Sequence, residues 1–173
     1  MFRKIPILLL LLSISVIAAA QSLTNLDTAY GFRQFKFRLK PTEIKDLKQV
    51  RTSIYKKDFV REYAYTGNDI TELNTVQITG IILSFYENRL FGIRISYDSS
   101  SPARINDDFN KIQYGLSAKY GTGWTTAVTD VPDITGRTWK AGKVVIDNIM
   151  SATGYGYINL IERKTYKEVM ADK

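Results

Sequence analysis

The sequence predicts an α+β protein, in which an antiparallel sheet of about six to seven strands carries two helices on one face. Three observations lead to this fold class. Residues 76–97 contain two apolar, β-rich runs, residues 105–120 carry apolar side chains at helical spacing, and a run of strands follows each expected helix. The expected order of elements is β-α-β-β-β-α-β-β-β.

The central element is expected to be a hairpin over residues 76–97, with Glu87-Asn88 as its two-residue loop. Asn tolerates the positive φ that such a loop requires. The pairs that follow from this loop are Tyr86 with Arg89, Phe85 with Leu90, Ser84 with Phe91 and Ile82 with Ile93. The ribbon is then apolar on both faces, so it belongs in the middle of a sheet.

The two faces of this hairpin are expected to differ in what covers them. Strand alternation places one set on the face that the helices cover: Ile78, Ile82, Phe91, Ile93 and Ile95. The opposite face carries Ile81, Leu83, Phe85 and Leu90. An apolar cluster with a polar rim on an open sheet is typical of a partner-binding site. The alternative is that the N-terminal segment or the C-terminal tail folds over these four side chains.

Residues 31–40 alternate as a half-buried strand does, and a short helix of about three turns is expected after Pro41. The apolar positions of this helix are Ile44, Leu47 and Val50.

The second helix is expected to start near Asn106 or Asp107, either of which can cap it, and to stop at Gly121. Its apolar stripe consists of Ile105, Phe109, Ile112, Leu116 and Tyr120. Further strands are expected at residues 59–66, 124–128, 138–149 (with a kink at Gly142) and 155–163. The charged tail is expected to fray.

The first twenty residues have the pattern of a secretory signal peptide. Arg3 and Lys4 precede an apolar run over residues 7–17 and a small-residue cleavage site at residues 18–20. An uncleaved N-terminal anchor is the alternative. We expect a flexible N-terminus at 21–30, one domain at 31–165 and a tail at 166–173, exported to the periplasm or secreted. No transmembrane segment is expected after cleavage.

Charge is concentrated near the N-terminus of the expected domain. Between Arg33 and Arg61 there are ten basic and three acidic residues, a local balance of +7. A basic region of this kind can attract anionic partners. The candidate anion-binding residues are Lys36, Arg38 and Lys40.

Several segments resemble small exported bacterial proteins, most of them uncharacterised. These segments are FKFRLKPTEIKDL at 35–47, FYENRLFGI at 85–93, Tyr120-Gly121, and the Trp139-Lys-Ala-Gly-Lys that opens a strand. The order of elements also resembles the fold of β-lactamase inhibitor proteins and of small outer-membrane assembly lipoproteins. The chain lacks the cysteines of both groups, so no inhibitor contact residue is carried over.

The composition excludes much of enzyme chemistry. The chain has no His and no Cys, which removes imidazole-based triads, thiol nucleophiles and the commonest metal ligands. We expect no catalytic residue, no cofactor and no metal, and no nucleic acid partner. The sequence therefore favours an exported, non-enzymatic binding module with a protein partner or a second copy of itself. One alternative is a binder of anionic polymer, glycan or lipid head groups, and a third is a carboxylate enzyme, which needs two acids facing one cleft.

Overall fold

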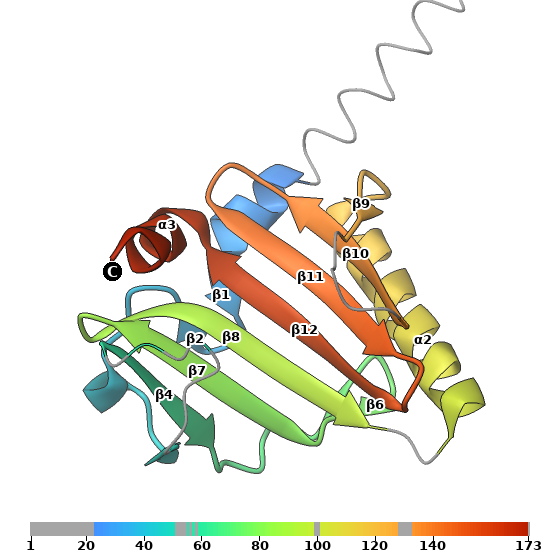
Figure 1. Cartoon of the computed structure of the whole chain (residues 1–173), viewed down its shortest axis with the longest axis horizontal. Helices are drawn as coiled ribbons and strands as arrows, with labels where there is room; N and C mark the ends of the chain where they lie inside the picture. The colour runs from blue at the N-terminus through green and yellow to red at the C-terminus, as the bar shows by residue number, and fades with distance from the viewer. Residues whose placement is uncertain are drawn as a thin grey trace, which may run out of the picture.

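The computed structural model describes residues 23–50, 55, 57, 59–98, 101–127 and 133–172. Its centre is an antiparallel sheet of eight strands in the order β3-β4-β7-β8-β12-β11-β10-β9 (Figure 1). The strands are β3 Leu47–Gln49, β4 Val60–Tyr65, β7 Gly80–Tyr86, β8 Arg89–Asp98, β9 Thr125–Thr126, β10 Ile134–Lys140, β11 Val144–Ser151 and β12 Tyr155–Glu162. The α+β class with a large antiparallel sheet is thus confirmed, with more strands than expected.

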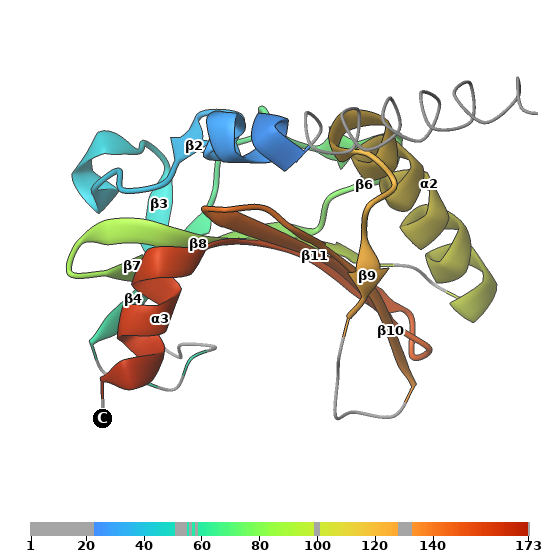
Figure 2. The same ribbon diagram turned by 90° about the horizontal axis from the view of Figure 1, so that it is seen from above.

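The sheet is covered differently on its two sides (Figure 2). Helix α2, Pro102–Tyr120, and the N-terminal segment lie on one side. Helix α3, Arg163–Ala171, lies on the other side. The predicted arrangement of two helices on one face is therefore wrong, because only the helix expected at 105–120 forms and α3, which was not expected, lies on the opposite face. The buried side chains between the sheet, α2 and the N-terminal segment form the main core.

The N-terminal segment is ordered against the sheet. Residues 23–29 are helical, and the side chain of Leu26 is fully buried in the main core. Strands β1, Gly31–Phe32, and β2, Phe35–Lys36, then form a small hairpin. The expected flexible N-terminus at 21–30 is therefore wrong for the described residues, and so is one strand over 31–40.

Backbone conformation explains why residues 31–40 do not run straight. Tyr30, Arg33 and Arg38 all have positive φ, and each bends the chain. The segment then docks onto the start of β8, where the backbone N–H of Arg38 donates to the carbonyl of Leu90 at 2.8 Å.

The helix expected after Pro41 is absent, and residues 41–43 form a single 3₁₀ turn, η1 Pro41–Glu43. Asp46 has a φ of 58°, which a helix does not allow, and its carbonyl accepts the N–H of Thr66 at 2.8 Å. Leu47 to Gln49 then pair with β4 as an edge strand. Strand pairing thus satisfies backbone groups that a short helix would have left unpaired at its ends.

The central hairpin has the expected loop. Glu87 and Asn88 have φ of 48° and 59°, as a two-residue hairpin loop requires. Tyr86 pairs with Arg89 and Phe85 pairs with Leu90, as predicted.

Beyond these two pairs the predicted register of the hairpin is wrong. A β-bulge shifts it, so that Ser84 pairs with Gly92 and Leu83 pairs with Ile93. A bulge adds one residue to one strand, so every later residue of that strand lies on the opposite face of the sheet. Phe91 is that extra residue, and it turns to the side of α3 while Ile93 and Ile95 turn to the main core.

The structure overturns the predicted partner site, because its face of the sheet is covered. Ile81, Leu83, Phe85 and Leu90 are 3%, 0%, 1% and 1% exposed, and all four lie in the main core. The N-terminal segment packs into the same core through Leu26, Phe35 and Phe37, which is the alternative that the sequence left open.

Helix α2 has the predicted buried stripe, Ile105, Phe109, Ile112, Leu116 and Tyr120. It starts earlier than expected because Ser101 caps it, its Oγ accepting the backbone N–H of Arg104 at 3.3 Å. Gly121 ends the helix with a φ of 81°, as predicted.

Two predictions for the C-terminal third of the chain are wrong. Residues 138–149 do not form one kinked strand, because the chain turns at residues 141–143 between β10 and β11. The tail does not fray either, because α3 fully buries Val169. Strand β12 agrees with the prediction.

Two further strands, β5 Glu72–Leu73 and β6 Val76–Gln77, form a short hairpin.

Within the described ranges, no helix combines the length and the apolar character needed to cross a membrane. The expected signal peptide at 1–20 lies outside the described residues.

Candidate functional site

The side of the sheet that carries α3 is the candidate site, and we call its part over β7, β8, β12, β11 and β10 the open face. Figure 1 looks onto this side, with α3 at its upper left. Among the described helices, α3 alone packs here. The half-buried side chains of the open face include Ile82, Arg94, Thr138, Val145, Asp147, Tyr157, Asn159 and Ile161.

A row of polar residues crosses the open face from strand to strand. Arg94 pairs with Asn159, Asn159 pairs with Asp147, and Asp147 pairs with Thr138. The Nε of Arg94 donates to Oδ1 of Asn159 at 2.9 Å, and the hydroxyl of Thr138 donates to Oδ1 of Asp147 at 2.6 Å. Each ionic side chain therefore has a neutral hydrogen-bond partner in the row.

Asp147 is held in surroundings that disfavour its charge. Burial raises the pKa of its carboxyl, and the hydrogen bond from Thr138 offsets only part of that effect. Arg94 lies two strands away, roughly 10 Å at the usual spacing of strands. No ion pair joins Arg94 and Asp147, although both lie in one row.

Tyrosines adjoin the polar row along β12. The guanidinium carbon of Arg94 lies 4.4 Å from the centroid of the Tyr157 ring, which is cation–π geometry. Tyr155, at the start of β12, is 46% exposed. An arginine stacked on one tyrosine with a second tyrosine nearby offers planar contact surface at low entropic cost.

The opposite end of this side is closed by α3. Val60, Tyr86, Phe91 and Val169 form a second apolar cluster there, against which Tyr55 and Tyr166 pack. The hydroxyl of Ser84 donates to the buried Glu62 at 2.7 Å. This end is packed as interior and leaves the polar row as the accessible part.

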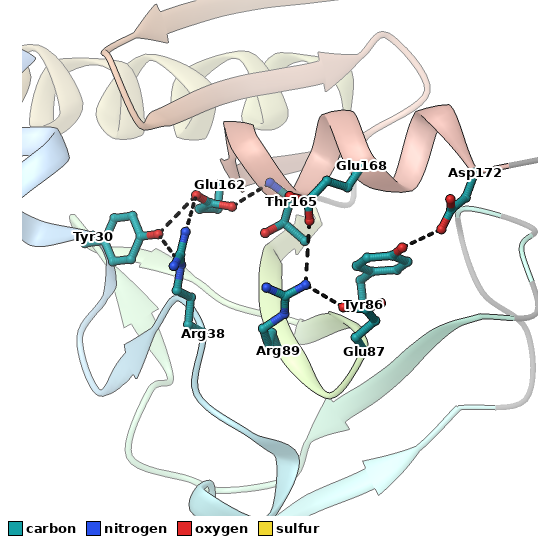
Figure 3. A network of polar contacts seen from close by, with 9 residues as sticks. All are labelled: Tyr30, Arg38, Tyr86, Glu87, Arg89, Glu162, Thr165, Glu168 and Asp172. Carbon is teal, nitrogen blue, oxygen red and sulfur yellow. Dashed lines mark hydrogen bonds and ion pairs between the residues drawn. The ribbon is translucent and has the colours of Figure 1, made fainter.

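A polar network anchors α3 to the rest of the chain (Figure 3). Glu162, 3% exposed, accepts the Tyr30 hydroxyl at 3.1 Å and the backbone N–H of Thr165 at 2.7 Å, and Arg38 lies 3.6 Å away. Burial by itself would raise the pKa of Glu162, but the hydrogen bonds from Thr165 and Tyr30 and the charge of Arg38 lower it on balance. Glu162 is thus a structural carboxylate that caps α3 and ties the N-terminal segment to it.

The same network binds the hairpin loop to α3. Arg89 lies 2.6 Å from Glu87 and 3.6 Å from Glu168, and the hydroxyl of Tyr86 donates to Asp172. These contacts fix the position of α3 at the border of the open face (Figure 3).

The predicted anion-binding residues do not share one site. Lys36 donates to the carbonyl of Ala29 at 3.0 Å, and Arg38 donates through Nε to the hydroxyl of Tyr30 at 3.0 Å. Lys40 lies at the start of η1, where its backbone N–H donates to Glu43 at 2.7 Å. Of the three, Arg38 lines a cleft of about 680 Å³, together with Lys143 and Lys164.

The residues of the polar row were not predicted from the sequence, although a signal exists. Arg94 and Asn159 each interrupt a mainly apolar strand, in FGIRISY and YGYINLI, whereas Asp147 in VVIDNIM is followed by Asn148, which is fully buried on the core side. A charged residue inside a mainly apolar strand favours the face away from the core. Across the described ranges, no three carboxylates gather closely enough to hold a metal ion.

Comparisons with protein-family models, with curated proteins and with solved structures found no match for the chain. The resemblance to small exported bacterial proteins therefore stays a prediction from the sequence.

Proposed function

We propose that this chain is an exported, non-enzymatic binding module of the bacterial envelope, and that it binds a protein partner on the open face. The observation that carries the proposal is the separation of Arg94 from Asp147 in one row of the sheet. Among the described residues neither Arg94 nor Asp147 has an ion-pair partner. Half-buried charges in that position are costly, and a binding partner that supplies complementary groups removes the cost.

The composition of the open face suits a protein better than a small molecule. Arg and Tyr are the residues that most often dominate the binding energy of protein interfaces. Here Arg94 pairs with Ile82, and the same face of the sheet carries two tyrosines and two more aliphatic side chains, Tyr155, Tyr157, Val145 and Ile161. The mixture of apolar and polar groups spread over several strands is typical of the centre and rim of such interfaces.

A second candidate is the binding of anionic polymers, glycans or lipid head groups. One observation favours it, because Arg38, Lys143 and Lys164 line one cleft. Binding of this kind would depend strongly on salt concentration.

Site-directed photo-crosslinking in envelope extract tests the two candidates. A photoreactive residue replaces Tyr155 on the open face or, as a matched control, Tyr114, which is 79% exposed on α2. We expect an adduct of defined mass from position 155 that persists at high salt and disappears in Arg94→Ala. An adduct of twice the chain mass would identify a second copy as the partner.

Two results would contradict the protein-binding proposal. One is equal crosslinking from positions 155 and 114, which indicates nonspecific contact. The other is an adduct that survives Arg94→Ala but is lost at high salt and in Lys143→Glu, which supports the anion-binding candidate.

A further inference from the structure

An apolar cavity of about 190 Å³ lies on the other side of the sheet, under the C-terminal half of α2. Its walls are aliphatic and aromatic side chains from the sheet, from α2 and from β1, namely Ile95, Ile146, Ile158, Leu160, Leu116, Tyr120 and Phe32. The cavity is slightly larger than an engineered apolar cavity of about 150 Å³ that stays dry and binds benzene. It therefore has room for an apolar group of comparable size.

The cavity has a polar mouth. Asn74, Gly115 and Lys119 line both the cavity and a wider groove of about 810 Å³ on the outer surface of α2. The side chain of Asn74 rests on Gly115, where the Cβ of any other residue would overlap its amide. Asn74 has a φ of 49° in the turn between β5 and β6, so the turn itself places this amide at the mouth.

The charges at the mouth are unequal. Lys111, in the groove, is paired with Asp107 at 2.7 Å and with Asp108 at 3.7 Å. Lys119 lies 5.2 Å from the centroid of the Tyr120 ring and, among the described residues, has no ion-pair partner. The mouth thus offers one amide and one cation without a carboxylate partner, directly above an apolar interior.

We infer that this cavity binds the tail of a single-chain amphiphile with an anionic head, such as a medium-chain carboxylate. The tail occupies the space between Leu116 and the sheet, and the carboxylate lies at Lys119 and Asn74. An apolar pocket with a few polar groups at one end is the usual form of a small-molecule site, because burial supplies affinity and the polar groups supply orientation. The site is on the opposite side of the sheet from the open face and does not depend on the function proposed there.

The test uses octanoate as the probe, with octan-1-ol as its neutral counterpart, followed by methyl NMR on the full domain. We expect octanoate to shift the methyl signals of Leu116, Ile146 and Ile158 saturably. Lys119→Glu should weaken octanoate binding on the order of tenfold, because it replaces attraction by repulsion. It should leave octan-1-ol binding unchanged. Lys167→Glu, on the exposed side of α3, is the control with the same change of net charge.

A cavity-filling variant provides the second arm. Leu116→Phe should abolish binding of both probes, because the larger ring occupies the tail site. Shifts confined to exposed methyl groups such as that of Ala118 in the outer groove, or equal weakening by Lys119→Glu and Lys167→Glu, would overturn the inference. The absence of any shift at millimolar octanoate would do the same. The charge variants alone decide the question if Leu116→Phe does not fold.

Discussion

Arg94 and Asp147 lie in one row of the open face with Asn159 between them, and each is hydrogen-bonded to a neutral side chain. A direct ion pair would have neutralised both charges within the fold. Because strand β12 lies between them, a cation and an anion stay available for a binding partner on a surface that is otherwise partly apolar. This arrangement costs stability, and the cost depends on pH because Asp147 must be ionised to carry its charge.

Asp147→Asn should stabilise the protein at pH 7. Burial raises the pKa of Asp147, so the folded chain binds its proton more tightly than the unfolded chain does. The free energy of unfolding then falls as pH rises from about 4, the unfolded pKa, through the folded pKa. The gain from Asp147→Asn should therefore be largest at neutral pH and vanish below about pH 4. Urea unfolding between acid and neutral pH measures it.

Thr138→Val is the companion variant for Asp147. It removes the hydrogen bond that lowers the pKa of Asp147, so the carboxyl should titrate at a higher pH than in the parent protein. NMR titration of the Asp147 carboxyl carbon measures the change. A downward shift would show that the Thr138 hydroxyl does not stabilise the ionised form.

Glu162→Gln should lower the free energy of unfolding at pH 7 by about 2 kcal/mol, because it weakens the cap of α3 and the contacts to Tyr30 and Arg38. The sign of the pH dependence is opposite to that of Asp147. Since the folded pKa of Glu162 is lowered, its stabilisation is present above about pH 4.3 and is lost as pH falls through the folded value.

The control for Glu162 is Glu168→Gln. Glu168 is 38% exposed, and its side chain forms an ion pair with Arg89 at 3.6 Å, so its loss should change stability little. Similar losses from both variants at pH 7 would mean that the Glu162 network does not anchor α3.

Helix α3 offers a neighbouring pair of residues on opposite sides. Val169→Ala should cost about 2 kcal/mol, because Val169 is fully buried against Phe91 and Tyr86 in the second cluster. Met170→Ala should cost almost nothing, since Met170 is 55% exposed. Chemical denaturation of the two variants checks whether the C-terminal residues belong to the folded unit, and equal midpoints would show that they do not.

These elements also show why part of the fold could be predicted from the sequence and part could not. The stripe of α2 from Ile105 to Tyr120 is local and continuous, and Gly121 supplies the stop, so the helix was predictable. The start at Ser101 was missed because Asn106 and Asp107 are equally good caps by composition. Helix α3 was missed because four of its nine residues are charged, and only tertiary contact with the second apolar cluster makes Val169 a core residue.

The candidate site could not be predicted because it depends on one inserted residue. The alternation of side chains predicts correctly which face each residue lies on within an unbroken strand. After the bulge at Phe91, however, the residues of β8 lie on the face opposite to the predicted one. The bulge moves Ile93 and Ile95 onto the face that carries Ile81, Leu83, Phe85 and Leu90, and this more apolar face is the one that α2 and the N-terminal segment cover. Such a bulge leaves no local signature when Leu90, Phe91 and Ile93 are all apolar.

The loop of the hairpin gives a test of its geometry. Asn88 has a φ of 59°, which Gly adopts without strain, so Asn88→Gly should leave stability unchanged or raise it by up to ~1 kcal/mol. Asn88→Val should cost about 1–2 kcal/mol, because a β-branched residue fits this conformation poorly. Urea unfolding of both variants measures the contrast. A stabilising Asn88→Val would place the loop elsewhere.

The facing of β7 is tested most directly by two neighbouring residues. Leu83 is fully buried in the main core, whereas Ile82 is half-buried on the open face. Leu83→Thr introduces a hydroxyl among apolar side chains and removes two carbon atoms, so it should cost about 3 kcal/mol or more. Ile82→Thr keeps a β-branched side chain at a strand position and should cost less than about 1 kcal/mol. Thermal unfolding followed by circular dichroism separates the two expectations. If Ile82→Thr unfolds the protein while Leu83→Thr does not, then β7 is turned the other way and Ile81, Leu83, Phe85 and Leu90 return as the exposed cluster.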